Sequence, residues 1–266
     1  MTEKIEVSYY ADASPEAVNR RAAQYFVDGI RSAAGARGKA RIAISGGNTP
    51  KHTFELLADP SEPYRQQIPW EKLELYWVDE RCVPPDHPDS NYRMTREALL
   101  DKVPLNQSQI FRIQGELEPE ESAARYEFDL RQSFRLEGAE LPYFDMVQLG
   151  MGPDGHTASL FPHTQGLHEI MRIAIANHVP QQKESWRATL TWPVIDRARD
   201  VFFLIEGADK VDALKGVFLG SYDPETYPSQ LIRPASHRIT LFLDSAAAVA
   251  LPPPQADGVG RLEITR

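Results

Sequence analysis

Residues 144–163 read FDMVQLGMGPDGHTASLFPH, and this order of elements indicates the fold class. The segment 144–150 is a short apolar run, which predicts a buried strand. It leads directly into a loop with glycines at positions 150, 152 and 155. A buried strand that ends in a glycine-rich loop is typical of α/β proteins with a parallel sheet, in which ligands bind at the carboxyl ends of the strands.

Outward from this stretch, short apolar runs alternate with helical patterns along the chain. We expect further strands at 5–10, 40–45, 73–78, 110–113, 187–192, 200–207 and 239–244. We expect helices from about 15 to 34 with Ser14 as cap, at 50–58 with Thr49 as cap, from Ser90 onward, at 119–136 and at about 208–219. This alternation predicts an α/β fold with a mostly parallel sheet and helices on both faces. No linker-like stretch divides the chain, so we expect a single domain over residues 1–266.

Composition and charge exclude several classes of protein. The 266 residues include 38 acidic and 29 basic side chains, a net charge of −9, and no basic block that would bind nucleic acid or an anionic membrane. The single cysteine, Cys82, excludes a disulfide framework and a multi-cysteine metal site. The N-terminal residues lack the apolar core of a signal peptide, and no apolar stretch is long enough to cross a bilayer. We therefore expect a cytoplasmic protein, either a monomer or a weak homo-oligomer.

The first candidate functional loop is SGGNTP, residues 45–50, between a predicted strand and a predicted helix. Its candidate binding residues are Ser45, Gly46, Gly47, Asn48 and Thr49. Unpaired backbone N–H groups at a helix N-terminus can bind an anion, and glycines permit its close approach. The same loop is equally compatible with a tight turn that binds nothing.

The second candidate is the loop after the strand at 73–78. Asp79, Glu80 and Arg81 begin this proline-rich segment, where a carboxylate can orient a base and a guanidinium can bind an anion. An exposed ion pair is the simpler interpretation of these residues alone. Cys82 has no sequence signature of an activated nucleophile, and a small structural residue is the favoured interpretation.

The third candidate is the turn that holds Asp154 and His156, which we expect to be followed by a short helix. A histidine with a carboxylate that fixes its tautomer can act as a general base; a helix-capping histidine is the alternative. The glycine spacing matches GxGxxG, but Pro162 cuts the expected helix short and no acidic residue follows at the spacing of a dinucleotide site. A metal site would need His163 or His168 as well, at spacings that match no standard ligand pair.

Two basic residues lie at strand ends further along the chain. Arg187 begins the strand at 187–192, and Lys210 follows the strand at 200–207. Both could complete a phosphate clamp, and both could equally be solvated.

These segments together resemble those of 6-phosphogluconolactonases, in the superfamily shared with glucosamine-6-phosphate deaminases. The strings that carry the resemblance are SGGNTP, WVDERCVPPDHPDSNY, GMGPDGHTASLFP, WRATLTWPVI and VFFLIEGADK, which occur in the family's order between about residues 40 and 235. The resemblance implies a Rossmann-like fold, a sugar-phosphate substrate and no cofactor.

The resemblance also implies roles for individual residues. His156 corresponds to the residue that activates water, with Asp79 and Asp154 near it and Arg81 facing the substrate. The loop at 45–49 would hold the phosphate together with Arg187 and Lys210.

One departure separates the two branches of the superfamily. Deaminases carry a glutamate where this sequence has Phe161, and tend to carry tyrosine at the position of Arg81. We therefore expect hydrolysis of 6-phospho-D-glucono-1,5-lactone. The base would be His156, and Arg81 or backbone N–H groups would stabilise the oxyanion without a metal. The alternatives are a glucosamine-6-phosphate deaminase and a non-catalytic sugar-phosphate sensor.

Overall fold

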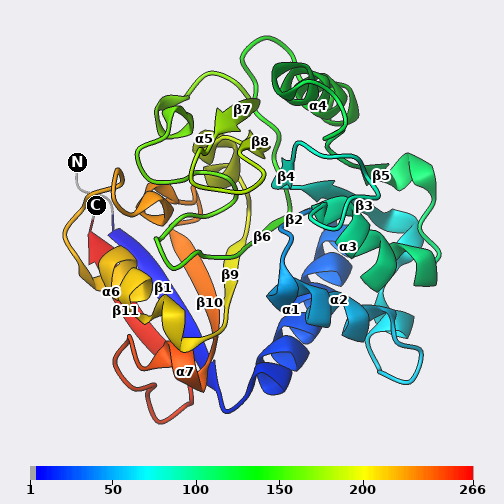
Figure 1. Ribbon diagram of the computed structural model, residues 1–266. Coiled ribbons are helices and arrows are strands. Elements are labelled where there is room, and N and C mark those ends of the chain that lie inside the picture. The colour runs from blue at the N-terminus through cyan, green and yellow to red at the C-terminus, as the bar shows by residue number, and fades with distance from the viewer. Residues whose placement is uncertain (1–3, 266) are drawn as a thin grey trace.

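The fold is built on an eight-stranded sheet, which the computed structural model describes within residues 4–265. The strands of this sheet are β1 (Lys4–Asp12), β2 (Ala40–Ile44), β3 (Leu73–Trp77), β5 (Ile110–Phe111), β6 (Met146–Leu149), β9 (Val201–Ile205), β10 (Arg238–Asp244) and β11 (Gly260–Thr265). Their order is β11-β1-β10-β9-β6-β2-β3-β5 (Figure 1). Every neighbouring pair is parallel except β1 with β11, which confirms a mostly parallel sheet.

Helices alternate with strands along much of the chain, as the sequence predicts, but the short helices at 192–196 and 245–248 were not predicted. The helices are α1 (Pro15–Arg37), α2 (Asn48–Ala58), α3 (Asn91–Ala98), α4 (Pro119–Phe134), α5 (Trp192–Asp196), α6 (Val211–Leu219) and α7 (Ser245–Ala248). Short 3₁₀ turns lie at Arg65–Gln67, Trp70–Lys72, Leu100–Lys102, Gln107–Gln109, Gln165–His168, Ala208–Lys210 and Pro228–Leu231. No helix in the described part of the chain combines the length and apolar character needed to cross a bilayer.

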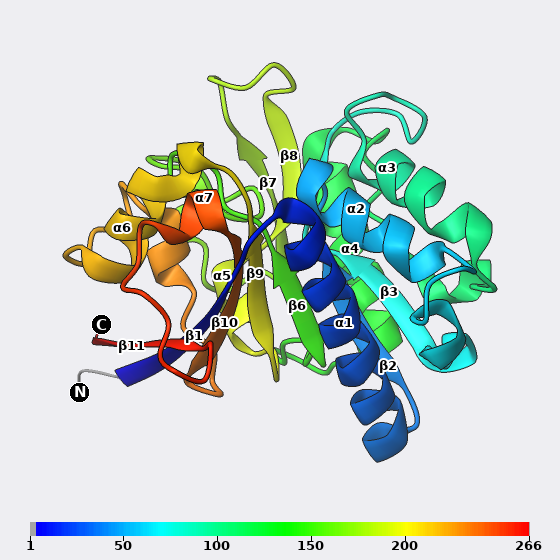
Figure 2. The ribbon, with the colours of Figure 1, turned by 90° about the horizontal axis from the view of Figure 1, so that it is seen from below.

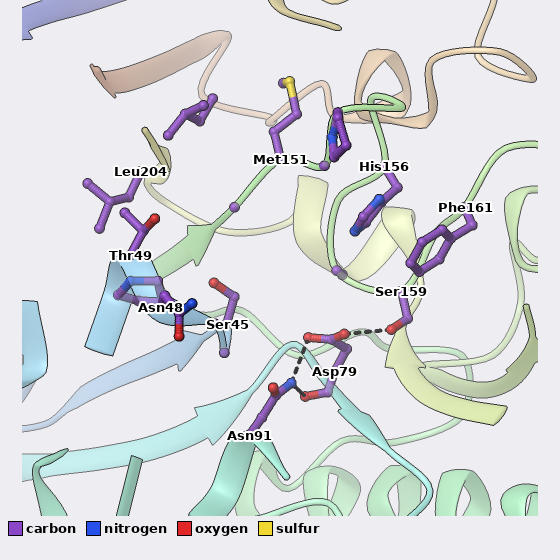
Figure 3. A pocket seen from close by; sticks show the side chains of 18 of the residues that line it. Ser45, Asn48, Thr49, Asp79, Asn91, Met151, His156, Ser159, Phe161 and Leu204 are labelled. Carbon is purple, nitrogen blue, oxygen red and sulfur yellow. Dashed lines mark hydrogen bonds between the residues drawn. The ribbon is translucent and has the colours of Figure 1, made fainter. Parts of the chain in front are cut away.

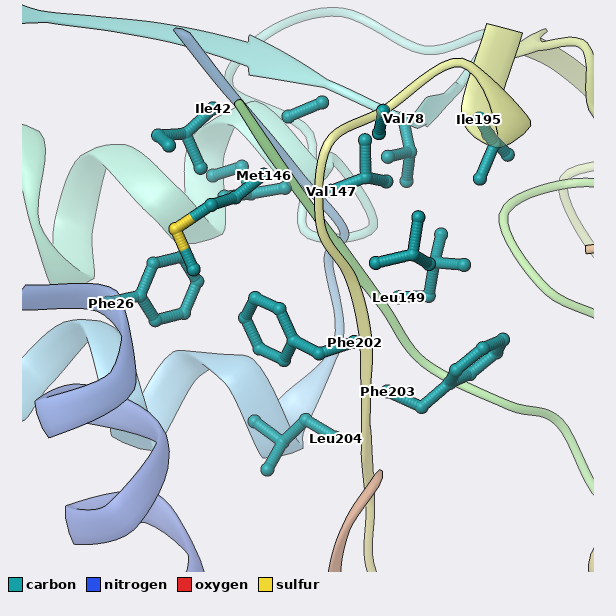
Figure 4. Close-up of a cluster of buried hydrophobic side chains, with 14 of the residues drawn as sticks. Phe26, Ile42, Val78, Met146, Val147, Leu149, Ile195, Phe202, Phe203 and Leu204 are labelled. Atoms are coloured by element: carbon teal, nitrogen blue, oxygen red, sulfur yellow. The ribbon is translucent and has the colours of Figure 1, made fainter. Parts of the chain in front are cut away.

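Helices cover both faces of the large sheet, as adjacent residues of β9 demonstrate. Phe202 packs edge-on against Phe26 of α1, with ring centroids 5.1 Å apart. Its neighbour Phe203 packs against Phe218 of α6 at 6.3 Å. Successive side chains of a strand point to opposite faces, so α1 and α6 lie on opposite sides of the sheet. Figure 2 shows α1 crossing the near face, and Figure 4 shows Phe202 beside Phe26 with Phe203 directed away from them.

A second, three-stranded antiparallel sheet departs from the expected pattern. It consists of β4 (Asp79–Arg81), β8 (Trp186–Leu190) and β7 (Ala174–His178), in that order. Residues 79–81 are therefore a strand and not the predicted loop. The strand forms because these residues pair with β8, and three polar residues show no strand pattern in their own sequence. The strand β7 and the edge strand β11 were not predicted from the sequence.

Helix starts agree with the predicted caps in two of three places. Ser14 and Ser90 cap α1 and α3 by accepting hydrogen bonds from backbone N–H groups. The prediction of Thr49 as a cap is wrong, because α2 already begins at Asn48 with Gly47 before it. The expected short helix after His156 is also wrong: residues 157–160 form a turn closed by a bridge between Thr157 and Leu160.

The topology places the three candidate loops at one rim. The strands β9, β6, β2 and β3 are consecutive neighbours in the sheet and run in the same direction. Their carboxyl ends therefore lie side by side, and the segments that follow them converge at the edge where α/β proteins bind ligands.

Candidate active site

A pocket of about 300 Å³ lies at this carboxyl edge, within the range of small-molecule sites. Its walls include every predicted site residue except Asp154, namely Ser45, Gly46, Gly47, Asn48, Thr49, Asp79, Arg81, His156, Arg187 and Lys210. Figure 3 shows Asn48 and Thr49 on one side of the pocket and His156 with Phe161 across it. All three loops therefore face the same cavity.

A hydrogen bond and a stacked aromatic ring fix the position of the His156 imidazole. Its Nδ1 lies 2.5 Å from Oδ1 of Asp154, which also accepts a hydrogen bond from the backbone N–H of His156. The ring of Phe161 stacks on the imidazole, with centroids 3.8 Å apart and planes inclined by 20°. A Cβ on Gly152 would lie 2.1 Å from Nδ1, so glycine is required there for the imidazole to take this place.

The bond to Asp154 defines which nitrogen of His156 is available. Partial burial raises the pKa of the Asp154 carboxyl, but the hydrogen bond and charge of His156 outweigh burial and hold that pKa below its usual value. An ionised carboxylate can only accept hydrogen bonds, so the proton of a neutral imidazole lies on Nδ1. Nε2 then carries the lone pair that can accept a proton.

Asp79 is buried and is held by other residues. Its Oδ2 accepts a hydrogen bond of 2.5 Å from Ser159, and its Oδ1 accepts a weaker one of 3.4 Å from Asn91 (Figure 3). Asp154, and not Asp79, is thus the carboxylate hydrogen-bonded to His156. Nothing in the sequence identified Ser159 or Asn91, because each is a common polar residue.

Two guanidinium groups enter the pocket from paired strands. Arg81 of β4 lies opposite Arg187 of β8 in the antiparallel register. Arg187 is only 5% exposed, and its Nη1 is buried without a hydrogen-bond partner within residues 4–265. Burial, together with the charge of Arg81, lowers the pKa of Arg187. A buried cation with an unpaired donor costs free energy, so this end of the pocket favours an anion.

The loop at 45–50 connects β2 to the N-terminus of α2. Gln148 of β6 fixes Ser45 by accepting a bond from its backbone N–H at 3.0 Å and donating one to its Oγ at 2.8 Å. Gly47, which precedes α2, has a φ of 107°, in the region that favours glycine, and no side-chain cap hydrogen bond forms at this helix start among residues 4–265. The first N–H groups of α2 are therefore free to face the pocket.

Lys210 reaches the pocket from the turn after β9. This turn starts at Gly207, with a φ of 100°, and includes a hydrogen bond from the backbone N–H of Lys210 to the carbonyl of Gly207. The ammonium group lies 2.8 Å from Asp209, whose carboxylate is mostly exposed. Lys210 therefore adds positive charge beside the loop at 45–50.

Unlike Asp79 and Arg81, Glu80 points away from the pocket wall. It is 2% exposed, does not line the pocket, and accepts hydrogen bonds from Ser90 Oγ and from the N–H groups of Asn91 and Tyr92 at the start of α3. Burial raises its pKa to about 7 against these bonds. Glu80 thus anchors α3 and is not itself part of the pocket wall.

The other candidates for chemistry lie outside the pocket walls. Burial raises the pKa of the Cys82 thiol to about 11, which disfavours the nucleophilic thiolate. His163 and His168 lie 4.0 and 3.2 Å from Glu225 and do not join His156. Within the described residues, the grouping compatible with a metal ion is His87, Asp89 and Glu184, and it contains none of the predicted site residues.

Comparison with known proteins places the chain in a family. The family model "Glucosamine-6-phosphate isomerases/6-phosphogluconolactonase" matches residues 13–241. The 6-phosphogluconolactonase of Synechocystis sp. is 44% identical over 225 residues, which cover 84% of this chain and 90% of that protein. The 6-phosphogluconolactonase of Homo sapiens is 37% identical over 221 residues, covering 83% and 84%. The structure of 6-phosphogluconolactonase from Trypanosoma cruzi superposes with a TM-score of 0.79 at 30% identity, covering 91% of this chain and 95% of that one.

The chain therefore belongs to the family of glucosamine-6-phosphate isomerases and 6-phosphogluconolactonases, and it is an enzyme. Its relatives within that family are the 6-phosphogluconolactonases, which are lactone hydrolases.

Proposed function

We propose that the chain hydrolyses 6-phospho-D-glucono-1,5-lactone to 6-phosphogluconate, with His156 as the general base. The observation that carries this proposal is the 2.5 Å contact between His156 Nδ1 and Asp154, in a pocket that also contains Arg187, whose buried Nη1 has no hydrogen-bond partner among the described residues. The contact leaves Nε2 of His156 for a water molecule. The Nη1 donor of Arg187 supplies a hydrogen bond and positive charge for the anionic end of the substrate.

The hydrolysis needs one proton acceptor and one group that stabilises negative charge. Nε2 of His156 takes a proton from water as the water oxygen attacks the lactone carbonyl. The resulting imidazolium, stabilised by Asp154, then gives a proton to the ring oxygen as the ester bond breaks. Arg81 in the pocket wall, or the N–H groups of the glycine loops, stabilise the oxyanion.

The phosphate is assigned to the loop at 45–49 together with Arg187 and Lys210. The uncapped N-terminus of α2 and the two cations supply hydrogen-bond donors and positive charge, as a phosphate dianion requires. Because the phosphate is remote from the carbonyl, its binding energy serves to position the ring against His156.

The position of Phe161 favours lactone hydrolysis over deamination. The site where deaminases carry a glutamate holds an apolar ring stacked on His156, so no carboxyl is available there to assist ring opening. The expected cytoplasmic location and the expected monomer or weak homo-oligomer stay predictions from the sequence.

The experiment is to follow acid release from freshly prepared lactone against the spontaneous rate, for the wild type and for His156→Ala. We expect the substitution to lower kcat by about 10²–10⁴-fold, the usual contribution of a general base. The variant should still bind 6-phosphogluconate, which shows that the pocket is intact. A near-normal kcat in the variant would exclude His156 as the base, and no turnover by the wild type would exclude the substrate.

A further inference from the structure

A polar network centred on the buried Asn19 reaches the pocket wall at Glu206 and connects the two sides of the proposed phosphate site. Asn19 of α1 is 2% exposed, and its amide makes three hydrogen bonds. Its Nδ2 donates to Glu206 Oε1 at 2.6 Å and to the carbonyl of Pro15 at 2.8 Å. Its Oδ1 accepts from the hydroxyl of Thr53, on α2, at 2.6 Å.

The chemistry of the partners fixes the orientation of the Asn19 amide. The carbonyl of Pro15 and an ionised Glu206 can only accept hydrogen bonds, so both must face the NH₂ group. The Thr53 hydroxyl is then left to donate to the oxygen. A network with one consistent set of donors holds its members in a single arrangement.

Glu206 connects this network to the turn that carries Lys210. It follows β9 directly and lines the pocket together with Thr49 and Lys210. The next residue, Gly207, donates its N–H to Asp244 at 3.1 Å and begins the turn that ends at Lys210. One side of the network thus contacts α2, and the other leads to the lysine.

The charge of Glu206 is at first sight unfavourable beside an anion site. Burial raises its pKa, with smaller opposing effects of the bond to Asn19 and of His52 and Thr49, and a further raising effect of Asp244. The negative charge of Glu206 by itself would repel a phosphate. The 2.6 Å hydrogen bond that it accepts from the buried amide of Asn19 indicates that Glu206 holds the structure around the site.

We propose that Glu206 and Asn19 are positioning residues that fix the loop at 45–49 relative to Lys210 and so set the affinity for the phosphate group. This inference rests on the proposed function. Neither residue needs to contact the reacting carbonyl, because the network acts through Thr53 on α2 and through the backbone of Gly207.

The test compares Glu206→Ala and Glu206→Gln with the wild type. A glutamine keeps an oxygen that can accept from Asn19, whereas alanine removes the acceptor. We expect Glu206→Ala to raise the KM for the phosphorylated lactone and the Kd for 6-phosphogluconate about ten-fold, with kcat changed less than about two-fold, as expected for lost ground-state binding. Glu206→Gln should restore both constants to near the wild-type values.

Thr53→Val tests the same network at another residue if Glu206→Ala folds poorly. Valine keeps the volume of the buried threonine and removes the hydroxyl that donates to Asn19. We expect a smaller rise in KM and Kd in the same direction. Glu55→Gln is the matched control, because Glu55 is a partly exposed acid on α2 that pairs with Lys51 at 3.8 Å.

Three results would overturn the inference: an equal fall in kcat, a Glu206→Gln variant as impaired as Glu206→Ala, or tighter binding in Glu206→Ala. The last would mean that the carboxylate acts only by repulsion. Failure of the proposed function is distinguishable, since it would appear as absent turnover and absent 6-phosphogluconate binding in the wild type.

Discussion

Arg187 lies opposite Arg81 in the pairing of β8 with β4, so two guanidinium groups face the same pocket. Like charges at paired positions are unfavourable, and Arg187 keeps a buried Nη1 with no partner in the described chain. An anionic group bound at Arg187, the role proposed above for the substrate phosphate, would offset this cost.

Arg187→Ala should therefore weaken binding more than it slows catalysis. Loss of a charge-assisted hydrogen bond, worth about 1.5–3 kcal/mol, predicts a rise in KM of about 10–100-fold with little change in kcat. Lys210→Ala should act in the same direction. Steady-state kinetics measure both constants, and Arg96→Ala, on the exposed side of α3, is the control. A fall in kcat with an unchanged KM would remove Arg187 from the phosphate clamp.

Asp154→Asn should lower kcat and leave KM close to its wild-type value. The amide keeps the size of the carboxylate but no longer carries the charge that stabilises the imidazolium of His156. We expect a loss of about ten-fold or more, but not larger than that of His156→Ala. Asp257→Asn, which removes an exposed partner of Arg261, is the matched control. Wild-type turnover in Asp154→Asn would show that the 2.5 Å contact has no part in the reaction.

Gly152→Ala should lower kcat by displacing the His156 imidazole, without removing any catalytic group. The added Cβ would lie 2.1 Å from His156 Nδ1 and 2.6 Å from Asp154 Oδ1, so it would force the pair apart. A displacement of about 1 Å in a reacting group can cost about 10²-fold in rate. Gly35→Ala, in α1, meets nothing within 4 Å and should be tolerated. Stopped assays of both variants give the comparison, and equal kcat values would contradict the assigned place of His156.

Glu80 should make stability depend on pH between about 4.5 and 7. Its pKa is raised to about 7 in the folded protein, so the folded state binds a proton more tightly than the unfolded chain does. The protonated Glu80 side chain makes its full contribution to the unfolding free energy below the pKa of the unfolded chain, about 4.5. That contribution is lost as the pH rises through about 7, the pKa in the folded protein. Urea unfolding at pH 5 and pH 8 should show a difference in unfolding free energy that is smaller in Glu80→Gln by roughly 1–3 kcal/mol.

A charged control completes the pH experiment. The hydrogen bond from Arg93 lowers the pKa of Glu97, so this exposed acid stays ionised across the same range. Glu97→Gln should therefore keep the pH dependence of the wild type. If Glu80→Gln also keeps it, Glu80 does not titrate in this interval.

Much of the fold could be predicted because its signals are local. Ser14 and Ser90 cap helices where the sequence places them, and the apolar runs at β2, β3, β6 and β9 are buried strands. Periodicity and capping depend on residues within a few positions of each other, so the sequence alone displays them. The prediction at Thr49 fails because Gly47, with its positive φ, precedes a helix that starts at Asn48, two residues before the predicted start at Pro50.

The candidate loops were also visible from the sequence, whereas their mutual contacts were not. The chain itself determined that glycines, Asp154 and His156 follow a strand, and that Asp79 and Arg81 follow another. The tertiary structure decided that Asp154 is the carboxylate bonded to His156, that residues 79–81 form a strand, and that Glu206 meets Asn19. The contact of Asp154 with His156 lies within one turn, and its geometry depends on how that turn folds. The pairing of β4 with β8 and the contact of Glu206 with Asn19 join segments far apart in the chain. They depend on strand register and on the packing of α1 against the sheet, which no local sequence pattern records.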